Sequence, residues 1–197
     1  MKKTSIEELK IALKKRLSKD SYEHSLRTMD IAIDLADIHG VDTKKAAVAA
    51  LLHDYARDLS GEELIASSRK AGHNINWVEE RLPYLLHAPL GATQVETDLK
   101  IDDQDILSAI RKHTYGATKM NPLELTVFLA DLIEPSRDGG KIGKVRDEAN
   151  VDLYKAFKLA YEYQIGKLVA QGRYIHPVTM EVWNKIVDME YMHGSGN

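Results

Sequence analysis

The sequence has no cysteine among its 197 residues, which excludes disulfides and thiolate metal sites. It also lacks any apolar run close to the roughly 20 residues that a membrane-spanning helix needs. No apolar signal core follows the lysines of the N-terminal MKKTSIEELK. These absences predict a cytoplasmic protein in which any metal ion is held by histidine and carboxylate side chains.

Blocks of one charge sign are missing as well. The formal net charge is -3, and no lysine or arginine run stands out, so we expect neither a nucleic-acid nor a membrane partner. A small phosphorylated ligand remains compatible with this charge, because a metal ion and two or three local arginines can neutralise it. The sequence leaves open whether the chain forms a homodimer.

Strand signals are also missing, since alternating runs of valine, isoleucine and threonine do not occur. Most segments instead follow a 3.6-residue apolar period, which predicts an all-α bundle in one domain over residues 1–197. The core is expected over about 20–135, with C-terminal helices over about 147–192 packed on it. A flexible glycine loop is expected over 136–145 and a disordered tail over 193–197. The predicted helices span about 4–18, 21–39, 42–57, 60–71, 75–82, 84–99, 103–114, 121–134, 147–172 and 177–192.

Six polar side chains interrupt apolar segments that read as buried. The dipeptide in LLHDYA alone is weak support for a site, because hydrogen-bonded polar pairs are common in cores. Several such groups without partners would be very costly, so we expect them to meet one another or a cation. They are His24, His53, Asp54, His87, His113 and Asp131.

Six histidine and carboxylate ligands exceed what one tetrahedral zinc ion needs, which indicates two ions or one six-coordinate ion. We favour two ions, with Asp54 as the bridging carboxylate. In this hypothesis one ion is bound by His24, His53 and Asp131, and the other ion is bound by His87 and His113. The donor set suits iron, manganese, cobalt or zinc.

Such a centre can supply a metal-bound hydroxide to attack phosphorus, so no protein nucleophile is needed. The sequence offers no Gly-x-Ser-x-Gly elbow and no Walker glycine loop for another chemistry. Such a centre is compatible with a metal-dependent phosphohydrolase, in which His53 and Asp54 would be the central catalytic residues.

Four further residues are candidates for substrate binding. Arg27 follows His24 by three positions and Arg57 follows His53 by four, so both arginines are expected on ligand-bearing helix faces. Each could equally form an ordinary surface ion pair. Thr114 could bind a phosphoryl oxygen or cap its helix, and Arg137 lies in the glycine loop after Asp131.

The ordered set, together with the strings EHSLRT, LLHDYARDLS, LLHAPLGA, RKHTYGATKM, LADLIEPSR and GRYIHPVT, resembles the HD-domain phosphohydrolases, and in particular the YqeK-type symmetrical bis(5'-nucleosyl)-tetraphosphatases. This resemblance implies an HD-type helical bundle around a dinuclear, often iron-containing centre. It further implies that the enzyme cleaves diadenosine tetraphosphate in the middle to give two ADP. Tyr115 departs from the pattern, because a small residue is common at that position.

Two other functions stay open. HD sites share their metal chemistry and differ in their pocket walls, so another nucleotide could be the substrate of a nucleotidase or phosphodiesterase. A non-catalytic HD signalling module is the alternative from another class. The complete set of six residues argues against that module.

Overall fold

The computed structural model describes residues 5–137 and 139–194, and every regular element in these ranges is a helix, as expected for the all-α class. The first helix begins with a capping box formed by Ser5 and Glu8. The elements are α1 (Ile6–Arg16), α2 (Lys19–Ile38), α3 (Thr43–Leu52), α4 (Gly61–Lys70), α5 (Trp77–Arg81), the 3-10 helix η1 (Pro83–Leu86), α6 (His87–Leu99), α7 (Gln104–Lys112), α8 (Pro122–Ile133), α9 (Gly140–Ala149), α10 (Leu153–Ala170) and α11 (Pro177–Gly194).

The main core lies where α2, α3, α7 and α8 pack on one another, with α6 against α7. Leu51, Leu107, Ile110 and Val127 fill it, and none of these side chains is exposed to solvent. Burying such side chains is the dominant stabilising contribution in a bundle of this kind. This packing brings the N-terminal part of α2 and the ends of α3, α6, α7 and α8 to one place, which positions the site.

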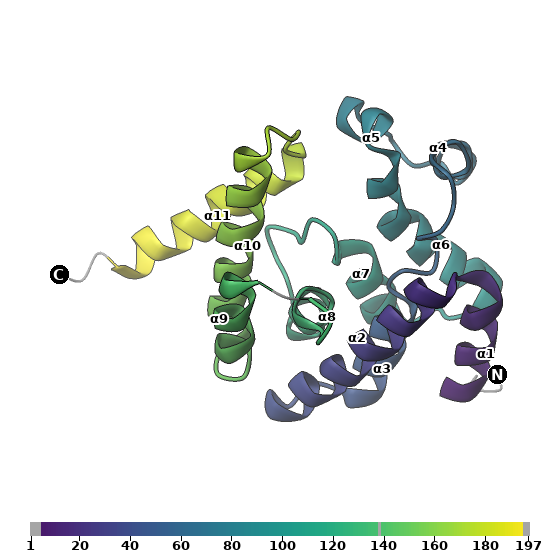
Figure 1. Ribbon diagram of the computed structural model, residues 1–197, viewed down its shortest axis with the longest axis horizontal. Helices are drawn as coiled ribbons and strands as arrows, with labels where there is room; N and C mark the ends of the chain where they lie inside the picture. The colour runs from purple at the N-terminus through teal and green to yellow at the C-terminus, as the bar shows by residue number, and fades with distance from the viewer. Residues whose placement is uncertain (1–4, 138, 195–197) are drawn as a thin grey trace.

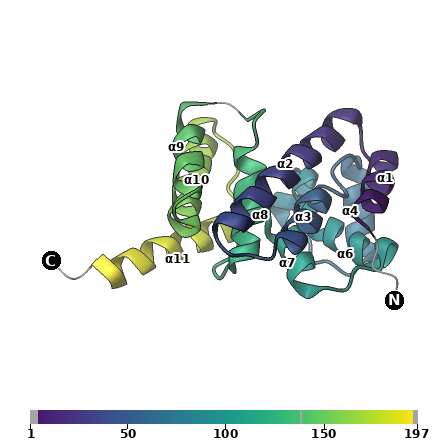
Figure 2. The same cartoon turned by 90° about the horizontal axis from the view of Figure 1, so that it is seen from below.

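A second apolar cluster joins the C-terminal helices to α8. Phe128 of α8 packs against Phe157 and Tyr161 of α10, with ring centroids 4.9 and 5.9 Å away. In Figures 1 and 2, α9, α10 and α11 lie together on one side of α8, and α1 lies at the opposite end of the molecule. The expected division into a core and packed C-terminal helices stays a prediction about domain organisation.

Three predicted boundaries are wrong. The helix expected over 42–57 ends at Leu52, and turns continue to residue 59. The helix expected over 147–172 is two helices, because Asp152 caps a new start for α10 through the backbone amides of Tyr154 and Lys155. Part of the predicted glycine loop is the helix α9, whose Ile142 and Val145 are buried in the second cluster.

The predicted tail cannot be compared, because residues 195–197 lie outside the described residues. In the ranges that are described, no helix combines the length and the apolar character needed to cross a bilayer.

Candidate metal centre

The dipeptide His53-Asp54 lies in a buried turn directly after α3, rather than inside a helix. The backbone amides of Tyr55 and Arg57 donate to the carbonyls of Leu52 and Asp54, so the turn satisfies its own buried polar groups. On a helix, neighbouring side chains point about 100° apart. The end of the helix lets His53 and Asp54 approach the same group of histidines.

Asp54 has one carboxylate oxygen directed at each half of the predicted set. Its Oδ1 lies 3.0 Å from Nε2 of His87 and 3.6 Å from Nε2 of His113. Its Oδ2 lies 3.4 Å from Nε2 of His53 and 3.7 Å from Nε2 of His24. This is the geometry expected of a carboxylate that spans two neighbouring cations.

Asp131 completes the first half from the C-terminal part of α8. Its Oδ1 lies 3.0 Å from Nε2 of His24 and 3.8 Å from Nε2 of His53. Donor atoms of His24, His53 and Asp131 come within 4.8 Å of one another, and so do those of His53, Asp54 and His113. The structure thus brings together all six residues that the sequence singles out.

The outer ring nitrogens fix how these imidazoles are protonated. Nδ1 of His53 donates to the carbonyl of Ala50 at 2.7 Å, and Nδ1 of His113 donates to that of Ile110 at 2.8 Å. Nδ1 of His87 likewise donates to a backbone carbonyl three residues earlier, that of Tyr84. In the neutral form of each ring, Nε2 then carries the lone pair, which is directed inward as in histidine metal ligands.

The inward lone pairs face one another at close range. Nε2 of His24 lies 3.2 Å from Nε2 of His53, and Nε2 of His87 lies 3.0 Å from that of His113. Two lone pairs at this distance repel unless a proton or a cation stands between them. The donor set of four imidazoles and two carboxylates therefore fits divalent metal ions.

The pKa values also indicate a site that attracts cations. Burial alone lowers the pKa of His53, but Asp54, Asp131 and the Ala50 carbonyl raise it to about 9. Burial raises the pKa of Asp54, yet His53 and His113 hold it well below its usual range. Burial lowers the pKa of His113. A proton on His53 thus takes the place that a metal ion would otherwise fill.

Glu134 is a functional candidate that the sequence reasoning missed. Its side chain is fully buried at the end of α8, and its Oε1 accepts from Nδ1 of His24 at 3.2 Å. Its Oε2 accepts from Nε of Arg27 at 2.8 Å and from the amide of Ser136 at 2.8 Å. Burial opposes ionisation, but these donors lower the pKa of Glu134 to about 2. Its signal in the sequence is an acid three residues after Asp131, within LADLIEPSR.

The predicted substrate-binding arginines have different surroundings. Arg27 pairs with Glu134, and Nη2 of Arg137 lies 3.4 Å from Oδ1 of Asp131, so both border the centre. Arg57 lies in the turns beyond α3, so the argument from a continuous helix face was wrong for it. Its side chain is exposed and forms no ion pair within the described ranges. Its proximity to substrate stays a prediction.

Thr114 follows α7, and its Oγ1 is buried without a hydrogen-bond partner in the described structure. This hydroxyl therefore does not cap the helix. A buried hydroxyl without a partner costs free energy, which is a reason to expect a ligand or a water molecule beside it.

A model of the HD-domain family matches residues 21–136, which include all six residues of the centre. The chain belongs to the HD-domain family. Its relatives include the symmetrical bis(5'-nucleosyl)-tetraphosphatase of Halalkalibacterium halodurans, which is 37% identical over 89% of this chain and 93% of that protein. The protein of the same name from Bacillus subtilis is 35% identical over 92% of this chain and 97% of its own length.

Solved structures agree with this assignment. The crystal structure of a predicted HD-superfamily hydrolase from Clostridium acetobutylicum, described as involved in NAD metabolism, has a TM-score of 0.90 and 34% identity. The comparison covers 94% of this chain and 98% of that one. The HD domain implies a divalent metal, which the six side chains described above could hold.

Proposed function

We propose that this chain hydrolyses diadenosine tetraphosphate at the central phosphoanhydride bond and releases two ADP. The convergence of four imidazole Nε2 atoms and two carboxylates carries this proposal. Two relatives of 35% and 37% identity over most of the chain, both named symmetrical bis(5'-nucleosyl)-tetraphosphatase, support the substrate and the position of cleavage.

We assign His24, His53 and Asp131 to one divalent ion and His87 and His113 to a second, with Asp54 between them. When bound, such a pair lowers the pKa of water at neutral pH and neutralises charge on the phosphoryl oxygens. Iron is the metal that we favour, in line with the family resemblance, and manganese, cobalt and zinc suit the same donors.

The remaining roles belong to side chains of the chain itself. Arg27 and Arg137 border the half that contains Asp131, where a guanidinium can hold a phosphate with two parallel hydrogen bonds. The unpartnered hydroxyl of Thr114 lies next to His113 and can donate to a phosphoryl oxygen. The leaving group is a nucleoside diphosphate, so positioning and charge neutralisation supply most of the rate enhancement. The cytoplasm remains the predicted compartment.

The test is anaerobic incubation of the purified protein with diadenosine tetraphosphate and iron(II) or manganese, followed by chromatography of the nucleotides. The expected product is ADP alone. ATP plus AMP would refute attack at the centre of the tetraphosphate. No product at all would contradict the proposed substrate, and a panel of nucleotides would then be screened.

A further inference from the structure

Arg16, the last residue of α1, contacts the turn that carries Asp54. Its Nε donates to the backbone carbonyl of Tyr55 at 2.6 Å, and its guanidinium carbon lies 4.1 Å from the centre of the Tyr55 ring. Tyr55 is buried, and no backbone amide in the described ranges donates to its carbonyl. A buried carbonyl needs a donor. Arg16 therefore satisfies the turn at the residue directly after Asp54.

The same guanidinium also contacts α6. Nη2 of Arg16 donates to Oε1 of Gln94, and Nη1 lies 3.7 Å from Oδ2 of Asp98. Gln94 follows His87 by seven positions, or about two helical turns, so both side chains lie on one face of α6. One side chain thus connects the turn after α3 with the helix that begins at His87.

These contacts enclose one half of the centre. Oδ1 of Asp54 lies 3.0 Å from Nε2 of His87, so the two residues meet at atoms that could bind the second ion. Arg16 fixes the turn on one side of this contact and α6 on the other. Ligands that are already held at binding distance lose less conformational freedom when the metal binds, which increases metal affinity.

The far end of the turn is attached to the start of α2. The carboxylate of Asp58 accepts from the backbone amide of Ser18 at 2.5 Å and from the hydroxyl of Ser21 at 2.7 Å. Ser18 caps α2, the helix that carries His24. Arg16 and Ser18 both precede the matched residues 21–136, so part of the support of the turn comes from outside the HD region.

We propose that Arg16 is a positioning residue for the metal centre. It binds the turn and α6 at the same time, and so keeps Asp54 opposite His87 at the second ion. The inference rests on the proposed function for its consequence in turnover, and on the geometry of the centre for its effect on metal binding.

The charge of Arg16 opposes this role, which makes the role testable. A cation near the centre repels divalent ions, so loss of the charge alone should strengthen metal binding or leave it unchanged. Loss of the hydrogen bonds to the turn and to α6 should weaken it. Partners that bond directly to a metal ligand change metal affinity by about 10- to 100-fold. Arg16 acts through intervening residues, so we expect the lower end of this range, about tenfold.

The test is calorimetric titration of manganese into the metal-free protein and its variants. Arg16→Ala should bind manganese about tenfold more weakly than the wild type. Arg16→Lys keeps the charge without the planar fork and should change in the same direction. Gln94→Met removes the acceptor on α6 and should also weaken binding, and it provides the test if Arg16→Ala does not fold. Unchanged or stronger manganese binding in these variants would overturn the proposal.

Two control variants separate positioning from a general loss of stability. Leu9 is buried in the main core, two turns before Arg16 on α1. Leu9→Ala should lower the melting temperature of the metal-free protein at least as much as Arg16→Ala, without changing manganese affinity. Asp98→Asn removes only an exposed ion pair, so it should leave manganese affinity unchanged. An equal loss of affinity in Leu9→Ala would overturn the proposal.

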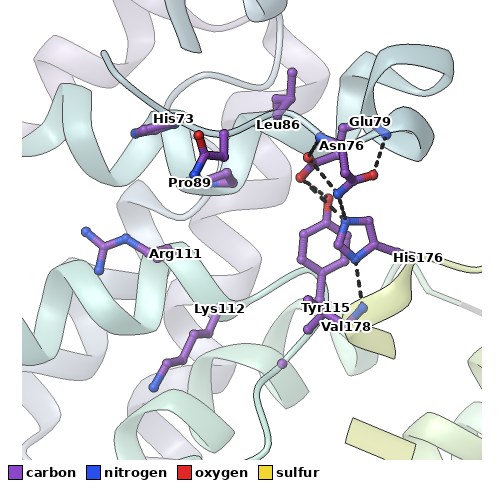
Figure 3. A pocket seen from close by; sticks show the side chains of 12 residues that line it. His73, Asn76, Glu79, Leu86, Pro89, Arg111, Lys112, Tyr115, His176 and Val178 are labelled. Carbon is purple, nitrogen blue, oxygen red and sulfur yellow. Dashed lines mark hydrogen bonds and ion pairs between the residues drawn. The ribbon is translucent and has the colours of Figure 1, made fainter. Parts of the chain in front are cut away.

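Turnover gives a second measurement. The cavity of about 340 Å³ beside His87 and His113 is lined by other residues, Leu86 and Tyr115 among them (Figure 3), so substitution of Arg16 leaves that wall in place. Arg16→Ala should need about tenfold more manganese for half-maximal ADP release, with a rate near that of the wild type at saturating manganese.

The two measurements can fail separately. Equal manganese affinities in wild type and Arg16→Ala would overturn the positioning role even if the enzyme releases ADP from diadenosine tetraphosphate. Conversely, a manganese affinity that depends on Arg16 in a protein without this hydrolase activity would refute the proposed function and keep the positioning role.

Discussion

Glu134→Gln is the substitution that most directly tests how the centre is held. Oε2 of Glu134 accepts from the guanidinium of Arg27 and from the backbone amide of Ser136, and neither donor can become an acceptor. The glutamine oxygen should therefore take the Oε2 position and its NH₂ group the Oε1 position. There it faces Nδ1 of His24, which donates to Glu134 in the native protein.

Two N–H groups cannot share one hydrogen bond, so the proton of His24 should move from Nδ1 to Nε2. Nε2 is the atom that lies 3.0 Å from Asp131 and faces the candidate ion. Loss of such an outer partner typically reduces metal affinity or activity by about 10- to 100-fold, equivalent to about 1.4–2.7 kcal/mol. We expect a decrease in this range, confined to the ion near Asp131.

Metal titration followed by calorimetry, and turnover measured against manganese concentration, will show the effect. Glu124→Gln is the matched control, because Glu124 is also a buried glutamate of α8 but accepts from Lys112 and Ser108 instead of from a candidate ligand. The control should lower the melting temperature without changing the metal dependence. An unchanged metal dependence in Glu134→Gln, or an equal change in Glu124→Gln, would refute the reasoning.

Three other outcomes are expected. Asp54→Ala should abolish metal binding at one or both positions and nearly all turnover, as measured by metal analysis and ADP release; retained hydrolysis would contradict the assignment of the ligands. Gly116→Ala should lower the free energy of unfolding by about 1–3 kcal/mol, because Gly116 has φ +67° and an added Cβ would lie 2.9 Å from Phe157. Gly166→Ala is the control, since no atom lies near its added Cβ, and it should not destabilise the protein. Thermal unfolding of the two variants measures the difference. The raised pKa of His53 means that its proton stabilises the metal-free fold below about pH 6.5 and that this contribution is lost as pH rises through about 9. Metal ions replace that proton, so metal affinity measured by titration should increase about tenfold per pH unit up to about pH 9, and a flat profile would contradict the protonation of His53.

The sequence alone was enough to predict that the six candidate ligands lie together, because the local pattern of residues shows which face of each helix is buried and which residues lie on it. His24, for example, shares a helix face with Thr28, and both side chains are buried in the structure. Polar side chains on faces that must be buried need partners, and the partners can be inferred without knowing how the helices pack. The same reasoning gave the all-α class.

Helix ends were less predictable, because tertiary contacts decide where they fall. The alanine-rich α3 stops at Leu52, where His53 and Asp54 turn into the centre, and Arg57 is carried out to the surface as a result. In α9, burial of Ile142 and Val145 outweighs the low helix propensity of the glycines. Glu134 was overlooked because an acid before a proline is typical of a helix end, and because its partners His24 and Arg27 come from α2, more than 100 positions earlier.

The asymmetry of the centre has a physical origin in the fold. One half is built from α2, α8 and the turn after α3, with Arg27 and Arg137 at its border. The other half is built from the ends of α6 and α7, which lie against the cavity of about 340 Å³. The segment after His113 is also packed from behind, since Gly116 has room only for a hydrogen atom between itself and Phe157 of α10. The C-terminal helices thus hold the loop that carries one candidate ligand and, through His176, form part of the cavity wall. HD enzymes with the same metal-binding residues can differ in substrate because the residues that line their cavities differ. Here the C-terminal helices both form part of the cavity wall and support the centre.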